Sequence, residues 1–208
     1  MSAKSFQIDS YSVAGTDHTT NQDRTLIINE DERCLLAIAD GAGGHGDGAA
    51  AAEIALAAIQ SASINTHASN SLFWQSQLIL IDRDLEAQQL GATTLVIVVI
   101  SNQRIVGSSV GDSRAWLIGH EQSTELTCGQ HRKPLLGDGG IMPVPFDIPY
   151  RSEAVLLGTD GLFNYANSDR LKTAVQSRKN PADIIKLAQL PNGGYVDDTT
   201  AICMYFDR

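Results

Sequence analysis

The sequence has little of what several protein classes need. Lysine and arginine number 15 against 24 aspartates and glutamates, and the net charge of −9 disfavours binding to nucleic acid or an anionic membrane, which needs a basic surface. No apolar run reaches the roughly 18–20 residues of a membrane span, and the first residues lack the apolar stretch of a signal peptide. We therefore expect a cytoplasmic protein with no nucleic-acid or membrane partner.

Cysteine is scarce as well. Cys34, Cys128 and Cys203 are far apart and form no Cys-x-x-Cys pair, so neither a disulfide framework nor a cysteine zinc site is indicated. Apolar residues, in contrast, make up 43% of the chain, which is enough for a sizeable core. Since no repeat, low-complexity segment or linker divides the 208 residues, we expect a single domain over 1–208.

Apolar runs predict strands near both ends of the chain, with helices between them. The links between the strands at 92–100, 104–110 and 114–118 are so short that these strands must form antiparallel hairpins. This pattern predicts an α+β fold of antiparallel sheets covered by helices, with an irregular segment at 127–150. The other predicted strands are 6–13, 25–28, 34–39, 153–158 and 200–206, and the predicted helices are one starting near Asp47 and those at 70–90, 168–177 and 181–190.

Aspartates stand at the ends of these apolar strands. A single aspartate there is a common turn residue, but acids beside five different apolar runs suggest one shared site. If they converge, two charges about 4 Å apart repel by about 4 kcal/mol at an effective dielectric near 20, and Mg²⁺ or Mn²⁺ would remove that repulsion. Gly41 fits such a site because a residue without Cβ lets its carbonyl approach a metal. The acids are Asp23, Asp40, Asp112, Asp160, Asp197 and Asp198.

The glycine-rich loop allows a second interpretation. Residues 41–46 match G-x-G-x-x-G between a strand and a helix, the pattern of a dinucleotide-binding loop. Against it, Asp40 would face the pyrophosphate, a second helix follows the first, and no acid ends a strand about 20 residues later. A phosphate-binding P-loop is excluded, because no Gly-Lys-Ser or Gly-Lys-Thr follows.

Six motifs follow one another between about Gly15 and Met204: Asn21-Gln22-Asp23, Ala39 to His45, Gly91 to Thr94, Val110 to Arg114, Leu156 to Leu162 and Asp197 to Thr200. Together they resemble the metal-dependent PPM-type (type 2C) serine/threonine protein phosphatases, in a bacterial-like short form. The resemblance implies a four-layer α/β/β/α sandwich of two antiparallel sheets flanked by helices, with a reduced flap at 128–147. It also implies hydrolysis of phosphoserine or phosphothreonine in proteins, and an opposing serine/threonine kinase.

The same resemblance implies a role for each acid. Asp40 would bridge two Mn²⁺ or Mg²⁺ ions, with the Gly41 carbonyl on one of them, and the attacking water would lie between the ions. Asp160 and Asp197 would complete the ligands of the other ion. Asp23 would ligate an ion or hold a water bound to it. Asp112, together with Asp160, resembles the pair that holds a third, weaker ion.

Two departures from the family pattern leave alternatives open. His18 stands where many members have an arginine that grips the substrate phosphate; a histidine cannot make the bidentate contact. We expect weaker phosphate binding or compensation by a group such as Arg24, unless His18 is only a loop residue. With the short flap, this keeps open a phosphoprotein-binding sensor of the same fold with little or no activity. His45 could donate a proton to the leaving oxygen or cap the glycine loop.

Overall fold

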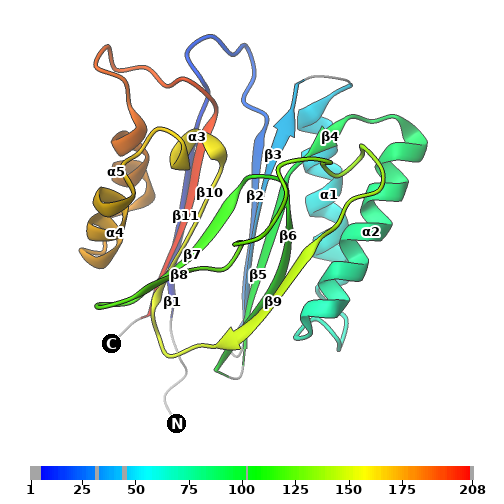
Figure 1. Ribbon diagram of the computed structural model, residues 1–208, viewed down its shortest axis with the longest axis horizontal. Helices are drawn as coiled ribbons and strands as arrows, with labels where there is room; N and C mark the ends of the chain where they lie inside the picture. The colour runs from blue at the N-terminus through cyan, green and yellow to red at the C-terminus, as the bar shows by residue number, and fades with distance from the viewer. Residues whose placement is uncertain (1–5, 31–32, 44–45, 102, 207–208) are drawn as a thin grey trace.

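Two antiparallel β-sheets lie face to face in the middle of the molecule, and helices cover the outer face of each (Figure 1). Helices α1 (Gly48–Ala62) and α2 (Ser71–Gln88) cover one sheet. Helices α3 (Asp160–Phe163), α4 (Ser168–Gln176) and α5 (Pro181–Ile185) cover the other, and α5 continues into the short 3-10 helix η1 (Lys186–Ala188). The computed structural model describes residues 6–30, 33–43, 46–101 and 103–206.

The strand order explains how distant segments meet. One sheet has the order β1-β11-β10-β7-β8, and the other has β2-β3-β5-β6-β9 with β4 paired to β3. All of these pairs are antiparallel. The strands are β1 (Phe6–Val13), β2 (Asp23–Asn29), β3 (Arg33–Ala42), β4 (Ala92–Thr93), β5 (Leu95–Ser101), β6 (Arg104–Val110), β7 (Arg114–Ile118), β8 (Ser123–Glu125), β9 (Val144–Pro149), β10 (Ala154–Gly158) and β11 (Thr199–Phe206).

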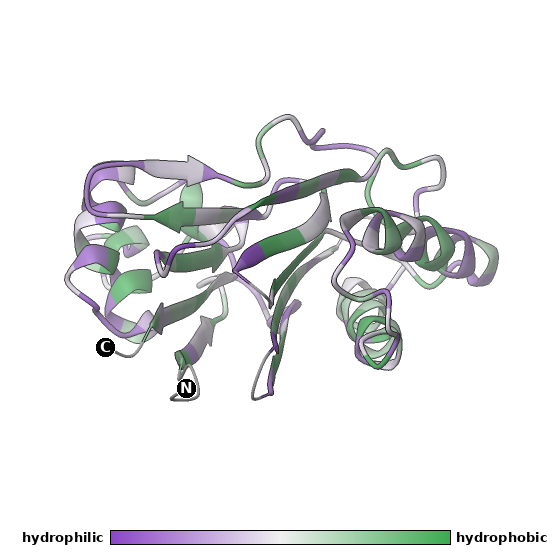
Figure 2. Ribbon diagram, turned by 90° about the horizontal axis from the view of Figure 1, so that it is seen from below, coloured by the Kyte–Doolittle hydropathy of each residue, from purple (hydrophilic) through white to green (hydrophobic). Residues whose placement is uncertain are grey.

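The central strands are apolar on both faces because each face meets a different core. In β3, Leu35 and Ala37 pack toward α1 and α2, whereas Leu36 and Ile38 pack against the other sheet. A third core lies between the β10–β11 sheet and α3–α5. Figure 2 shows the layers from below, with hydrophobic colouring along the central strands. The predicted four-layer α+β sandwich is confirmed.

The two long helices begin where their capping residues predict. The Asp47 side chain accepts a hydrogen bond from the backbone N–H of Ala50 at the start of α1. The Asn70 side chain caps α2 in the same way, through the N–H of Leu72. α2 ends at Gln88, and the backbone of the next residue, Gln89, is left-handed, a common helix end.

Three elements differ from the sequence prediction. The segment predicted to be irregular contains β9, an edge strand beside β6, and its two prolines are tolerated because an edge strand can leave backbone positions unpaired. One helical turn, α3, follows β10 directly and starts at Asp160. The short strand β8 was also not predicted.

The dinucleotide-binding interpretation is wrong for this fold. That interpretation requires a parallel strand after the first helix, but α1 is followed by α2, and β3 is antiparallel to each of the three strands with which it pairs. Among the described helices, none combines the length and apolar composition that crossing a membrane requires.

Candidate functional site

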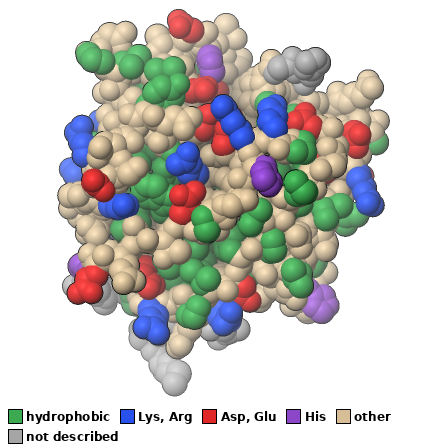
Figure 3. All heavy atoms as spheres, in the orientation of Figure 1, with side chains coloured by type: hydrophobic (Ala, Val, Ile, Leu, Met, Phe, Trp, Pro, Cys, Tyr) green, Lys and Arg blue, Asp and Glu red, His purple; other side chains and the backbone are tan. Residues whose placement is uncertain are grey.

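A cavity of about 630 Å³ opens where the two sheets meet, at the upper end of the molecule in Figure 1. β3 ends there, α3 starts there after β10, and β11 begins there. Figure 3 shows acidic and basic side chains gathered near this end of the molecule. The predicted site residues in the cavity wall are His18, Asp40, Gly41, Asp112, Asp160 and Asp197.

Asp23 lies beside this wall, opposite Asp40 in the β2–β3 register. Paired residues project from the same face of a sheet, so two carboxylates stand side by side. Only 5% of Asp23 is exposed. Its Oδ2 accepts hydrogen bonds from the Thr200 hydroxyl (2.6 Å) and the Thr159 hydroxyl (3.0 Å), while its buried Oδ1 has no partner among the described residues.

Burial and mutual repulsion raise the pKa of these acids. Burial raises the pKa of Asp23 to about 7; the two threonine hydroxyls oppose this shift, and nearby Asp198 and Asp197 reinforce it. The pKa of Asp40 lies well above its ordinary value because of burial and then repulsion by Asp23, Asp160, Asp197 and Asp112. The negative charges of acids from both sheets therefore make ionisation of Asp23 and Asp40 unfavourable.

Asp160 experiences the same field from the other sheet. Its pKa is raised to about 6, first by burial and then by repulsion from Asp112 and Asp197, and the positive charge of Arg132 opposes the shift. An orphaned buried carboxylate oxygen, mutual repulsion and all-oxygen donors fit a hard divalent cation. In the described ranges, however, no three His, Cys, Asp or Glu side chains already form a compact group that could hold a metal ion. The metal roles of these residues stay predictions.

Asp198 has a structural role that the sequence did not reveal. It is buried, and its Oδ1 accepts hydrogen bonds from the N–H of Gly15 (2.8 Å) and from Nδ1 of His18 (2.9 Å). Its Oδ2 accepts the N–H of Gln22 (2.7 Å). This single carboxylate fixes the 15–22 loop to the start of β11. The adjacent acids look alike in sequence and both line the cavity, and only the fold shows that Asp198 also holds the loop.

His18 lies in the cavity wall, held by Asp198. That hydrogen bond raises the pKa of His18 above its ordinary value; partial burial opposes the shift, and the charges of Asp198, Asp197 and Asp17 add to it. The ring is therefore protonated more readily than an isolated histidine. The other predicted histidine, His45, lies outside the described residues.

Arg24 does not compensate for the missing arginine. Its Nε donates to Glu53 (2.8 Å), and its NH1 donates to the carbonyls of Asn21 (2.8 Å) and Asp23 (2.9 Å). It is also not part of the cavity wall. The cations that do line the cavity are Arg132 and Lys133, from the loop between β8 and β9. Beyond their place in the predicted flap, no local pattern indicated that these two residues belong to the site.

Gly41 has a packing role in addition to any role of its carbonyl. A Cβ at Gly41 would collide with the backbone of Gly48, the first residue of α1. A Cβ at Gly48 would collide in turn with the Gly41–Ala42 peptide. The two glycines therefore let the start of α1 contact the end of β3 directly, next to Asp40.

Comparisons with known proteins agree with the predicted family. A sequence model of the family described as Protein phosphatase 2C matches residues 15–138. Serine/threonine phosphatase stp of Listeria innocua is 23% identical, over 78% of this chain and 79% of that protein. Two solved structures share the fold, each over 98% of this chain. Stp1 from Staphylococcus aureus has a TM-score of 0.82 at 21% identity, with 96% of its chain covered. The catalytic domain of PstP, in complex with two manganese ions, has a TM-score of 0.78 at 21% identity, with 99% covered.

The prediction of a PPM-type phosphatase, made from six short motifs, is thus confirmed at the level of the family. The matched segment includes the motifs of Asp23, Asp40 and Asp112, and it ends before those of Asp160 and Asp197. The chain belongs to the protein phosphatase 2C family.

Proposed function

We propose that this protein is a metal-dependent serine/threonine protein phosphatase that hydrolyses phosphoserine and phosphothreonine in proteins. The observation that carries the proposal is one cavity lined by aspartates from both sheets, where burial and then repulsion by neighbouring acids raise the pKa of Asp40 and of Asp160. Named serine/threonine phosphatases among the relatives, and the manganese complex of PstP, support it.

The residues that would hold Mn²⁺ or Mg²⁺ are Asp40, Asp160 and Asp197, with the Gly41 carbonyl and with Asp23 behind Asp40. Asp112 would share a third, weaker ion with Asp160. Bound divalent ions supply Lewis-acid chemistry, since they lower the pKa of water and neutralise phosphate charge.

The chain's own groups supply position, charge and proton handling. Thr159 and Thr200 occupy Oδ2 of Asp23 and leave its buried Oδ1, beside Asp40, without a hydrogen-bond partner among the described residues. When His18 donates from Nδ1 to Asp198, Nε2 of the protonated ring remains to donate to a phosphate oxygen. Lys133 adds positive charge to the same wall. His45 as the proton donor to the leaving oxygen stays a prediction.

The decisive test is hydrolysis of a phosphoserine peptide and of p-nitrophenyl phosphate with Mn²⁺. We expect activity that EDTA abolishes, and a loss of roughly 100-fold or more in Asp160→Asn, because a ligand carboxylate is neutralised. Asp84→Asn, an exposed acid of α2 outside the cavity wall, is the matched control and keeps wild-type activity.

Two outcomes would contradict the proposal. Wild-type protein that hydrolyses neither substrate in ample Mn²⁺ would refute a phosphatase. If that inactive protein still bound Mn²⁺ and held a phosphopeptide tightly, the sensor alternative would replace it. The same proposal includes a phosphorylated protein as substrate and an opposing serine/threonine kinase. It also includes a cytoplasmic location and a single domain over residues 1–208.

A further inference from the structure

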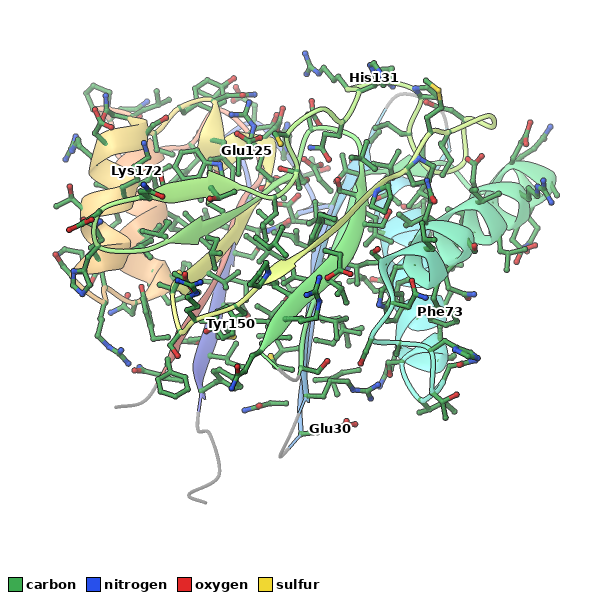
Figure 4. All side chains as sticks on the ribbon, turned by 60° about the horizontal axis from the view of Figure 1, so that its bottom comes forward. Glu30, Phe73, Glu125, His131, Tyr150 and Lys172 are labelled. Atoms are coloured by element: carbon green, nitrogen blue, oxygen red, sulfur yellow. The ribbon has the colours of Figure 1, made fainter. Side chains whose placement is uncertain are left out.

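Arg132 forms an ion pair with two acids of the cavity. It belongs to the loop at 126–143, and the residue before it, His131, lies on that loop at the end of the molecule opposite Tyr150 and Glu30 (Figure 4). Its Nε lies 2.6 Å from Oδ2 of Asp112, and its NH2 lies 3.8 Å from Oδ2 of Asp160. A loop cation thus spans two carboxylates that come from different strand ends.

The Arg132 side chain also separates two neighbouring cavities. Arg132 and Asp112 line both the main cavity and a neighbouring hollow of about 470 Å³. The neighbouring cation, Lys133, lines the main cavity but has its Nζ 3.8 Å from Asp138, away from the cavity acids. Arg132 is therefore placed on the Asp112–Asp160 side of the cavity, apart from the side where Asp23 and Asp40 pair.

The contact of Arg132 uses the oxygens that a cation on this side would need. Arginine stays charged at every physiological pH, so its contact with the acids is not released by loss of a proton. A divalent ion held by Asp112 and Asp160 would either share Oδ2 of Asp112 with the guanidinium or bind Oδ1 next to its positive charge, and both arrangements favour release of Arg132. Displacement is feasible because 75% of the Arg132 side chain is exposed, and exposed ion pairs contribute little.

We propose that Arg132 is a tethered cation that competes with a divalent ion for the Asp112–Asp160 pair, and so sets how much Mn²⁺ or Mg²⁺ loads this side of the cavity. Without the ion, the guanidinium partly neutralises the two acids. With the ion bound, Arg132 is released to solvent at the cavity rim. This inference rests on the proposed function, because it takes the cavity acids as metal ligands.

The test is a titration of metal-free protein with Mn²⁺ by calorimetry, with free Mn²⁺ counted by electron paramagnetic resonance. Arg132→Gln removes the charge but keeps a polar side chain, and it should tighten the weakest class of Mn²⁺ site by roughly fivefold, the worth of one exposed ion pair. Arg132→Lys keeps the charge and should stay near wild type. Lys133→Gln removes a neighbouring charge that does not contact these acids, and it should change this class far less.

The outcomes separate this inference from the proposed function. Mn²⁺ binding that is the same in wild type and Arg132→Gln would overturn the competition alone, as would an equal tightening in Lys133→Gln. If no variant bound Mn²⁺, the proposed metal site itself would be refuted. Tightening in Arg132→Gln that disappears in the double variant with Asp112→Asn would support the competition and identify the carboxylate concerned.

Discussion

The cavity acids predict that the metal-free protein loses stability as pH rises toward neutrality. Asp160 has a pKa of about 6 in the folded protein, against 3.8 as its ordinary value. Between these values the folded state binds more protons than the unfolded state, so the free energy of unfolding falls as pH rises. Below pH about 4 the carboxyl is protonated in both states, and the penalty is absent.

The size of the effect follows from the shift. A difference of about 2 pKa units, at about 1.4 kcal/mol per unit, makes Asp160 responsible for about 3 kcal/mol over the whole window. About 1.4 kcal/mol of this falls between pH about 5 and about 7.5. Only 14% of the Asp160 side chain is exposed, so solvent screens it little. Asp23, with its pKa raised to about 7, contributes in the same direction.

Urea denaturation in EDTA at a series of pH values measures this dependence. Wild type should lose stability between pH about 5 and about 7.5, and Asp160→Asn should lose about 1.4 kcal/mol less over that interval. Asp84→Asn, on the exposed face of α2, should behave like wild type. Excess Mn²⁺ should restore most stability at the higher pH, because a ligand at about 100 times its Kd adds roughly 2.7 kcal/mol.

The reasoning would be refuted by wild-type stability in EDTA that is flat or rises over this interval. An Asp160→Asn profile parallel to that of wild type would show that Asp160 is not the titrating group.

Two further substitutions test the contacts that hold the site. Thr200→Val should lower the free energy of unfolding by about 1–3 kcal/mol, because Oδ2 of Asp23 loses its closest donor, while Thr200→Ser keeps the hydroxyl; equal melting temperatures for the two variants would contradict this. Gly41→Ala should lower the melting temperature by more than Ala42→Ser does, because the new Cβ meets the backbone of Gly48; an unchanged melting curve would show that α1 can move away without cost.

Much of the fold could be predicted because the strands have strong local signals. The run at 34–39 is apolar at every position, and the structure explains this by its burial on both faces. The acids at the ends of such runs could be placed near one another, because the turns and ends of antiparallel strands lie at the edges of the sheets. Their roles came from the family motifs and not from the spacing.

Other parts of the site depend on contacts between segments far apart in the chain. Asp198 meets Gly15 and His18 across about 180 positions, and no local pattern distinguishes it from Asp197. Arg132 lies in a loop without periodicity, and only the packing of that loop brings it to Asp112. The edge strand β9 could not be predicted from the sequence, because two prolines in so short a segment are typical of a loop.

The register of β2 and β3 places Asp23 opposite Asp40, a pairing of like charges that weakens a sheet. The hydroxyls of Thr159 and Thr200 satisfy one oxygen of Asp23, and its other oxygen stays buried without a partner among the described residues. An asparagine at Asp23 would relieve the repulsion and still accept both hydroxyls, so folding alone gives no reason for a carboxylate here. A bound cation would explain the carboxylate. Its binding would offset the repulsion between Asp23 and Asp40, which otherwise lowers the stability of the strand pair.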